Sequence, residues 1–468
     1  MKFKKLILTG STVLAGALPF TMIACNNSKP DQDINAQFAS LSNDEKKRFI
    51  TDAISEFELE NDAKADLINT ILKDAGTYGA VIWYIKSVES YLGKVQAYEQ
   101  AKFGLDNLRK PADTVSTPES TDSIVQFDWS QNFNTAQKVD DPASDKVIPV
   151  VFMDIDETVL QNDYTEAYAM LNGGFKTEVK ETFDAKGFRR EVPGAVDFIN
   201  YTQEHGALVM YNSDTNLSKT TLEGIKKNLK ALGVKYVADF QFWMRGAMPY
   251  TPKNAADLTD EKTKNLSADE AKALAKNTTF TKEFNKTPWK AWENWKVAEA
   301  IGRSIYKNDR MNAVDNNTNG WDFNQTDNKS GKNVKLKVVM KIGDNFNDFF
   351  DRRTKGLSNE DRKKVYLEET NGALMKLFAL GGSKGLSFDY ESAQKDDFDD
   401  KNKLKDPKKF WKNLSYNQAY VMIPGNAEYG GWAEPYGYGE FKKFYEAMKK
   451  IAETPDYQKA PTDNKPIL

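Results

Sequence analysis

The sequence predicts an α/β fold in which helices cover both faces of a mainly parallel sheet. Four segments each combine an apolar run, which has the composition of a buried strand, with polar or turn residues at its end. They are 146–156, 206–214, 333–351 and 417–432. A segment with helical spacing, which ends at Gly233, follows the second strand. Strands that alternate with helices are typical of parallel α/β sheets.

The length and composition are those of a globular protein with one large or two smaller domains. The chain has 468 residues, of which 40% are hydrophobic and 28% are charged. The formal net charge of −3 provides no basic excess, so a nucleic-acid polymer is not an expected partner.

The N-terminus predicts export and a lipid anchor. Three lysines lie within the first five residues, an apolar stretch follows over 6–24, and Cys25 is the only cysteine of the chain. This order is that of a signal peptide, and MIAC, residues 22–25, resembles a bacterial lipobox whose cysteine is lipidated. An ordinary N-terminal membrane helix is the alternative. With Cys25 lipidated, the exported part has no thiol, which excludes disulfides and thiol catalysis.

The chain divides into five predicted parts. A signal peptide over 1–25 is followed by a polar tether over 26–43 and by a helical N-terminal or cap segment with a linker over 44–145. The α/β core spans 146–445, and a tail spans 446–468. Within the core, three polar stretches are expected to be surface insertions: 250–287, 308–333 and 353–412.

Polar and acidic residues cluster where the predicted strands end. They are Asp154 and Asp156 after the first strand, Ser213 and Asp214 after the second, and Asp344 and Asp348 after the third. Ligands of parallel α/β sheets bind at the carboxyl ends of the strands. Carboxylates that come together there need a cation, and hard oxygen ligands without a thiol favour Mg²⁺ over zinc.

The residue inventory also limits the chemistry. His205 is the only histidine, so a histidine-rich metal site is excluded, and a Ser–His–Asp triad is possible only through that residue. Its position before Gly206, at a predicted helix end, favours a structural role. An aspartate can instead be the nucleophile of phosphoryl transfer, and a second carboxyl two residues later can act as acid and base.

Four segments resemble one enzyme family. DIDET, 154–158, resembles the first motif of the haloacid dehalogenase (HAD) superfamily, and DIDETVLQNDY is similar to class C nonspecific acid phosphatases, which are bacterial surface lipoproteins. KIGDNFNDF, 341–349, resembles the second signature of that family. The helical sequence that starts at Ala80 and IPGNAEYGGW, 423–432, resemble its N-terminal segment and its C-terminal turn. The resemblance implies a HAD-like Rossmannoid core.

The resemblance implies a role for each matched residue. Asp154 would be the nucleophile and a Mg²⁺ ligand, and Asp156 would be the general acid/base with its backbone carbonyl on the metal. Asp344 and Asp348 would complete the metal site. Two further residues, Ser213 and Tyr429, would contact the phosphoryl oxygens and the rest of the substrate respectively.

The sequence departs from the family in three places, of which one is the spacing from DET to the following tyrosine, Tyr164, which is one residue short. Asp214 and Thr215 stand where the family usually has Asn-Arg, which removes a positive group near the site and adds a negative one. The third motif of the family, a lysine before a helix, is also not clearly recognisable. Within 287–302, Lys290 is the first choice and Lys296 the second, and either could be an ordinary solvated lysine.

The sequence therefore predicts a Mg²⁺-dependent phosphomonoesterase, lipid-anchored outside the cytoplasm on a bacterial surface, that hydrolyses small phosphomonoesters such as nucleoside monophosphates. A narrow 5′-nucleotidase is one alternative, and transfer of the phosphoryl group to an alcohol is another. A third is a catalytically weak surface lipoprotein that keeps the fold for binding.

Overall fold

The computed structural model describes residues 75–109, 123–124, 146–171, 175–216, 218–245, 305–316, 335–379, 382–401 and 403–425, with Ser42, Glu45 and Glu453. Almost all of them belong to one compact unit, Thr77–Tyr438 with 463–468. The predicted signal peptide and the 250–287 insertion lie outside the described residues, as do nearly all of the predicted tether and tail. Within the described ranges, no helix combines the length and apolarity needed to cross a bilayer.

The predicted sheet is confirmed, and it contains more strands than the sequence indicated. The strands are β1 Ser123–Ile124, β2 Lys146–Met153, β3 Leu208–Asn216, β4 Phe242–Arg245, β5 Lys335–Gly343, β6 Ser383–Phe388 and β7 Trp411–Met422. Their order is β4-β3-β2-β5-β7-β6, with β1 beside the start of β2, and only the β6–β7 pair is antiparallel. Strands β3 and β4 therefore lie on one side of β2, and the later strands β5, β7 and β6 lie on the other. The point at which the strand order reverses is at the carboxyl end of β2, where ligands of such sheets bind.

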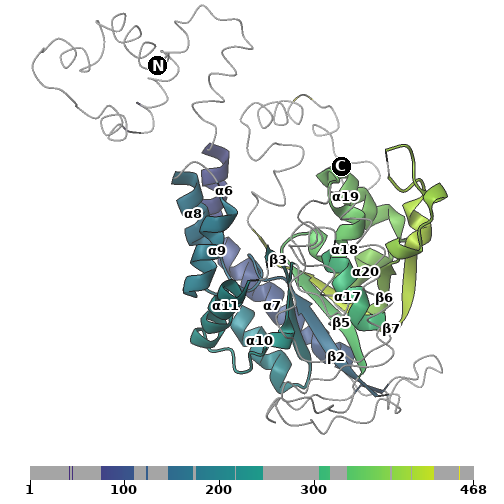
Figure 1. The fold of residues 1–468 in the computed structure, drawn as a ribbon, viewed down its shortest axis with the longest axis horizontal. Coiled ribbons are helices and arrows are strands. Elements are labelled where there is room, and N and C mark those ends of the chain that lie inside the picture. Colours follow the sequence, from purple (N-terminus) through teal and green to yellow (C-terminus); the bar gives the residue numbers. More distant parts are fainter. Residues whose placement is uncertain are drawn as a thin grey trace, which may run out of the picture. The chain divides into compact units, whose positions relative to one another are not determined.

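Helices cover both faces of the sheet (Figure 1). They are α6 Ala75–Lys86, α7 Val88–Arg109, α8 Asp163–Leu171, α9 Thr177–Lys186, α10 Ala195–Glu204, α11 Lys219–Ala231, α17 Lys307–Asn316, α18 Asn347–Thr354, α19 Asn359–Lys364 and α20 Ala373–Phe378. Consecutive residues of β5 show the two layers, since successive side chains of a strand point to opposite faces. Met340 lies against Gly104 of α7, and Lys341 lies over the ring of Phe350 in α18.

The segment before the core is helical where the structure describes it, but it buries only part of the face that its sequence indicates. Helical spacing at three and four residues selects an apolar face, and on that face Tyr98 is buried whereas Ile82, Val88 and Leu92 are 61%, 59% and 48% exposed. The helix is interrupted at Ser87. The buried side chains of α6 and α7 are mixed in polarity and include Tyr84, Ser90, Lys94, Tyr98, Ala101 and Leu105.

The stretch 353–412 is not a surface insertion. It contains α19, α20 and β6, and together with α18 and β7 it encloses a second hydrophobic cluster. The cluster is rich in aromatic rings, and Phe349, Phe350 and Tyr420 are fully buried within it. The apolar residues of this cluster were not recognised in the sequence, because they alternate with charged residues that lie on the solvent side of short helices and strands.

The start of the 308–333 stretch is likewise buried rather than inserted. Helix α17 spans Lys307–Asn316 and packs against β3, β5 and α18. Its first turn is charged, and its residues Lys307 to Arg310 are all buried. A buried charged turn is expected only where partners compensate the charges, and these partners belong to the site described below.

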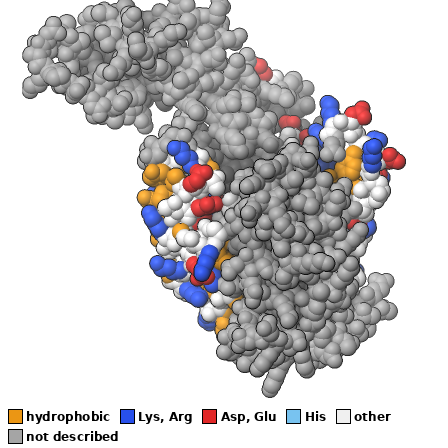
Figure 2. Space-filling view, viewed as in Figure 1, with side chains coloured by type: hydrophobic (Ala, Val, Ile, Leu, Met, Phe, Trp, Pro, Cys, Tyr) orange, Lys and Arg blue, Asp and Glu red, His pale blue; other side chains and the backbone are white. Residues whose placement is uncertain are grey.

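Hydrophobic side chains are also exposed on the side of the molecule that carries α8 and α9 (Figure 2). Tyr164, Tyr168 and Phe188 surround the buried Phe183, with ring centroids 4.9 to 6.1 Å from it. Phe175, which precedes α9, is 53% exposed.

Candidate active site

The loop after β2 places two aspartates at the carboxyl edge of the sheet. The backbone N–H of Asp154 donates to the carbonyl of Ile342 on β5, so the strand pairing continues to the first aspartate. The loop then folds back through a hydrogen bond of 2.9 Å from Glu157 N to Leu160 O, with Glu157 at a φ of 59°. Tyr98 of α7 donates its hydroxyl to the carbonyl of Thr158 and so ties the loop to the N-terminal helices.

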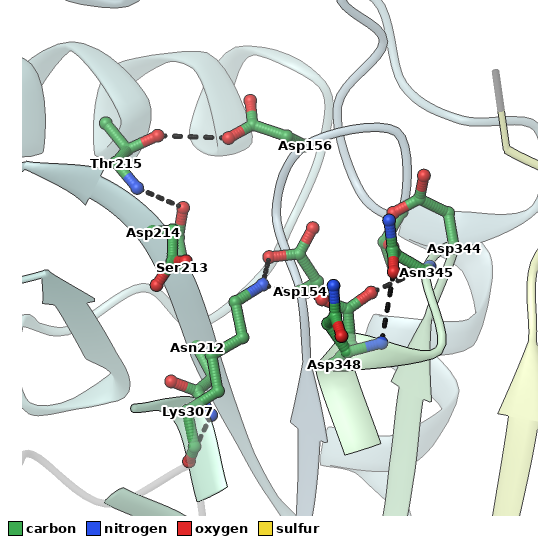
Figure 3. A network of polar contacts seen from close by, with 12 residues as sticks. Asp154, Asp156, Asn212, Ser213, Asp214, Thr215, Lys307, Asp344, Asn345 and Asp348 are labelled. Carbon is green, nitrogen blue, oxygen red and sulfur yellow. Dashed lines mark hydrogen bonds and ion pairs between the residues drawn. The ribbon is translucent and has the colours of Figure 1, made fainter. Parts of the chain in front are cut away.

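Three carboxylates meet at this edge, as Figure 3 shows. Asp154, Asp344 and Asp348 each offer an oxygen within 4.8 Å of the others. Burial, followed by the Asp348 and Asp154 carboxylates, raises the pKa of Asp344 well above its usual range. Burial is also the main reason why the pKa of Asp154 rises to about 8. Without a cation the fold therefore opposes full ionisation of this group.

Two glycines leave room for the carboxylates. A Cβ atom at Gly343 would lie 2.3 Å from Asp348 Oδ2, and one at Gly425 would lie 2.4 Å from Asp344 Oδ2. Either contact is far too short for a real side chain. Gly343 in the KIGDN segment thus leaves space for Asp348, and Gly425 in the IPGN turn leaves space for Asp344.

Among the residues that the structure describes, Lys307 is the lysine that contacts the acidic group, and sequence reasoning missed it. Its Nζ contacts Asp154 Oδ1 and lies 2.8 Å from Asp348 Oδ1. Although burial lowers it, these two carboxylates hold the pKa of Lys307 well above its usual range. Lys307 is therefore a cation at the centre of the site.

The backbone of Lys307 is fixed from two sides. Asp351 accepts hydrogen bonds from the N–H groups of Lys307 and Asn308, at 2.7 and 2.9 Å, and so caps the start of α17 from α18. Asn212 of β3 donates its side-chain amide to the carbonyl of Lys307 at 3.1 Å. Three elements that are distant in sequence thus set the position of one ammonium group.

Asp156 is held as a carboxylate by a separate set of partners. Its Oδ1 lies 2.8 Å from Arg189 Nη2 and 3.1 Å from Lys180 Nζ, and its Oδ2 accepts from Thr215 Oγ1 at 3.0 Å. Burial favours the neutral form, but Lys180 and Arg189 hold the pKa of Asp156 well below its usual range. Asp184 balances both cations, at 2.6 Å from Lys180 and 3.0 Å from Arg189.

The end of β3 has more positive charge around it than the sequence indicated. Asp214 lies 3.3 Å from Lys355 Nζ and 3.7 Å from Arg310 Nη2, so two cations surround the carboxylate that replaces the usual asparagine. Thr215, in place of the usual arginine, contacts Asp156. Ser213 is fully buried, and its Oγ accepts the N–H of Thr215 at 3.0 Å.

These groups border a cavity of about 360 Å³. Its walls include the acidic group, Lys307, Asp156 and the Asp214–Lys355 pair. Phe175, at the side of α9, supplies an apolar part of the wall. The cavity can therefore hold a small anion at the acidic group with an organic portion extending outward.

The acidic group suits a divalent cation. Its donors are hard carboxylate oxygens, as divalent ions such as Mg²⁺ require. Burial and neighbouring carboxylates raise the pKa values of Asp154 and Asp344 despite the presence of Lys307, so a further cation would favour their ionised forms. The backbone carbonyl of Asp156, which was predicted as a further ligand, stays a prediction.

Several predicted site residues lie outside the described residues: Lys290, Lys296, Tyr429 and Cys25. His205 has the structural role that its position predicted. It ends α10, its Nδ1 lies 2.7 Å from the carbonyl of Tyr201, and its ring stacks on that tyrosine with centroids 3.9 Å apart.

The residues that the sequence did not reveal share one property, which is that the catalytic aspartates they contact are far away in the chain. Lys307 lies in a charged segment, SIYKNDR, that looks solvated. Lys180 lies within α9 and Arg189 follows that helix, and neither has a motif around it. The one available signal for Lys307 was its position just before a helical segment between the two acidic clusters.

Comparisons with known proteins agree with this arrangement. A family model described as "HAD superfamily, subfamily IIIB (Acid phosphatase)" matches residues 107–374, which is more than half of the chain and includes every described site residue named above except Tyr98 and Gly425. No curated protein sequence matches the chain significantly.

Two solved structures resemble the chain at low sequence identity. One is the class C acid phosphatase from Bacillus anthracis, at 15% identity and a TM-score of 0.38, covering 82% of this chain and 98% of that one. The other is the same enzyme with tungstate bound, at 17% identity and a TM-score of 0.38, covering 83% and 99%.

The family match includes the loop after β2, the end of β3, Lys307 and the acidic cluster after β5, which are the parts that the geometry brings together. The chain therefore belongs to the acid phosphatases of HAD subfamily IIIB, and it is a phosphoric monoester hydrolase.

Proposed function

We propose that the protein is a Mg²⁺-dependent phosphomonoesterase that acts through an aspartyl-phosphate on Asp154, outside the cytoplasm, with nucleoside monophosphates among its substrates. The observation that supports this best is the position of Asp154. It lies at the carboxyl edge of β2, within the acidic group, with Lys307 Nζ on one of its oxygens.

The first step is attack by a carboxylate oxygen of Asp154 on the phosphorus atom. The bond between phosphorus and the ester oxygen breaks, and the leaving oxygen takes a proton from Asp156. Lys307 neutralises charge on the transferred group and on the attacking carboxylate, which is the main means by which phosphoryl transfer is accelerated. Its contacts with Asp154 and Asp348 support this role.

The second step is hydrolysis of the aspartyl-phosphate. Asp156, now a carboxylate, takes a proton from water, the water oxygen bonds to phosphorus, and the bond to Asp154 breaks to release phosphate. The contacts of Asp156 with Arg189 and Thr215 favour this ionised form. To act as the acid of the first step, Asp156 must leave the Arg189 guanidinium and gain a proton.

Asp154, Asp344 and Asp348 would hold the metal ion. When bound, Mg²⁺ would neutralise phosphoryl oxygens and lower the pKa of the carboxylates that hold it. Mg²⁺ is preferred over softer ions because the described ligand set consists of carboxylates.

Export and anchoring rest on the N-terminal sequence. The basic start, the apolar stretch over 6–24 and Cys25 support a lipid-anchored protein on a bacterial surface. Hydrolysis there would release nucleosides and phosphate for uptake.

The test is phosphate release by the full-length protein from p-nitrophenyl phosphate and from a panel of nucleoside monophosphates, with Mg²⁺ and with EDTA. We expect turnover that requires the metal and falls by at least about a thousandfold in Asp154→Asn. A folded protein that binds Mg²⁺ and releases no phosphate would overturn the proposal. Turnover of a single nucleotide would identify a narrow nucleotidase instead. Radiolabelled palmitate on the wild type but not on Cys25→Ala would support the anchor.

A further inference from the structure

An exposed ion pair lies beside the buried site. Asp214 lies near the end of β3, and Lys355 follows α18; their side chains are 43% and 50% exposed and 3.3 Å apart. Both residues line the cavity that contains the acidic group. The phosphoryl site itself is far more enclosed, since Lys307 and Asp154 are 8% and 7% exposed. The pair therefore lies where the outer part of a substrate would pass.

Positive charge exceeds negative charge at this pair. Arg310 is fully buried, and its Nη1 donates to three neutral oxygens, those of Asn212, Ser213 and Trp243. Among the described residues, the one carboxylate within ion-pair distance of Arg310 is Asp214, at 3.7 Å. Lys355 shares that carboxylate and otherwise lies 5.3 Å from the neutral ring of Tyr306.

Lys307, the lysine of the phosphoryl site, does not contribute to this excess of positive charge. Lys307 has two carboxylate partners of its own, Asp154 and Asp348. Asp351 also lines the cavity, but burial raises its pKa to about 7, and its oxygens accept backbone N–H groups of α17. Two cations thus share the single carboxylate of Asp214, and the half-exposed one, Lys355, can turn toward a ligand.

We propose that Lys355 is a specificity-determining residue that binds a second anionic group of the substrate, so that the enzyme favours phosphomonoesters with a carboxylate or further phosphate a few bonds from the scissile one. The proposal deepens the proposed function and rests on it. Asp214 holds Lys355 at the cavity when no substrate is present, and it competes with the incoming anion. Arg310 keeps the potential positive when Lys355 leaves Asp214.

The test compares two substrates of the same skeleton, 3-phosphoglycerate and glycerol 3-phosphate, which differ by a carboxylate in place of a hydroxymethyl group. With the full-length Mg²⁺-loaded protein, Lys355→Met should lower kcat/KM for 3-phosphoglycerate about five- to tenfold and leave glycerol 3-phosphate nearly unchanged. Asp214→Asn should raise the former selectively. Lys364→Met is the matched control, because Lys364 forms an equally exposed pair with Asp361 at 3.2 Å outside the cavity walls.

A binding measurement separates this inference from the proposed function. In Asp154→Asn, calorimetric titration with each phosphate ester should show tighter binding of 3-phosphoglycerate, and the added Lys355→Met substitution should abolish that preference. Equal losses for both esters in Lys355→Met would overturn the inference and assign Lys355 to the phosphoryl group. A preserved binding preference without turnover in the wild type would support the inference while the proposed function fails.

Discussion

The charge state of each site residue follows from its neighbours rather than from its type. Asp154 and Asp156 are two residues apart and equally acidic in water, yet the pKa of Asp154 is raised to about 8 and that of Asp156 is well below its usual range. Burial favours the neutral form of both residues. At Asp154 the contact with Lys307 offsets this effect only in part and Asp348 adds to it, whereas at Asp156 the two cations Lys180 and Arg189 outweigh it. Environments that separate two carboxyl groups in this way are typical of an acid/base pair with distinct roles.

Lys307 is the residue on which a single substitution is most informative. Lys307→Met removes the cation that contacts Asp154 and Asp348, so we expect kcat to fall by about 10²- to 10³-fold. Lys290→Met, measured beside it with p-nitrophenyl phosphate, separates the structural assignment from the sequence prediction. A larger loss at Lys290 would contradict the role of Lys307.

Among the elements of the fold, the glycine-containing turns after the strands determine where the carboxylates of the acidic group can lie. Gly425 lies after β7, and its missing side chain gives Asp344 its place. The turn therefore acts on the metal site although it supplies none of the three carboxylates.

Gly425→Ala should weaken metal binding. The new Cβ would lie 2.4 Å from Asp344 Oδ2 and 2.7 Å from Asp344 Cβ, so the whole side chain must move. We expect the Mg²⁺ concentration for half-maximal activity to rise by about tenfold or more. Gly79→Ala is the control, because its Cβ would meet nothing within 4 Å. Unchanged metal affinity in Gly425→Ala would show that the turn does not constrain Asp344.

Strand β5 contains a buried lysine on the face opposite α7. Lys341 is 2% exposed, lies 4.3 Å from the ring centroid of Phe350 and 5.0 Å from that of Tyr420, and has its pKa lowered to about 8 by burial. The unfolded chain therefore binds more protons than the fold between about pH 8 and 10.5. Stability should rise with pH across this window.

Lys341→Met should consequently stabilise the protein at pH 7. Removal of the buried charge is worth at most about 3 kcal/mol, and loss of the ring contacts offsets part of it. Thermal unfolding at pH 7 and at pH 10 measures the effect, and the gain should shrink at the higher pH. A lower Tm at pH 7 would mean that the ring contacts outweigh the burial cost.

At the scale of the whole molecule, one edge of the sheet collects the site from distant segments. Asp154, Asn212 and Asp344 come from three parallel strands, and Lys307 starts a helix between the second and the third. Helix α7 supports this edge from the other side of the sheet through Tyr98. Metal binding at this edge should therefore be linked to the stability of the entire core.

Metal removal should make stability depend on pH. Without a cation the folded pKa of Asp154 is about 8, above its ordinary value of 3.8. Its contribution to stability is full below about pH 4 and is lost as the pH rises through 8. We expect the Tm of the EDTA-treated protein to fall across this range, and saturating Mg²⁺ to raise the Tm most at pH 8. An equal Mg²⁺ effect at pH 5 and pH 8 would contradict this linkage.

The presence of the sheet, its four main strands and the acidic ends of β2 and β5 could be predicted from the sequence alone. Strands with continuous apolar runs are recognisable because both of their faces are buried, and acidic motifs are recognisable because their spacing is local. The sequence also predicted helices within 44–107 and before Gly233, where the structure has α6, α7 and α11.

The residues that complete the site could not be predicted, because contacts between distant segments of the chain bring them together. Lys307, Arg189 and Lys355 meet Asp154, Asp156 and Asp214 across 153, 33 and 141 positions of the chain. In the sequence these cations cannot be told from solvated lysines and arginines, because what distinguishes them is burial and a carboxylate from another element. For the same reason 353–412 looked like an insertion. Its apolar residues are spread over short elements, and they form a hydrophobic cluster only when α18, α20, β6 and β7 pack together.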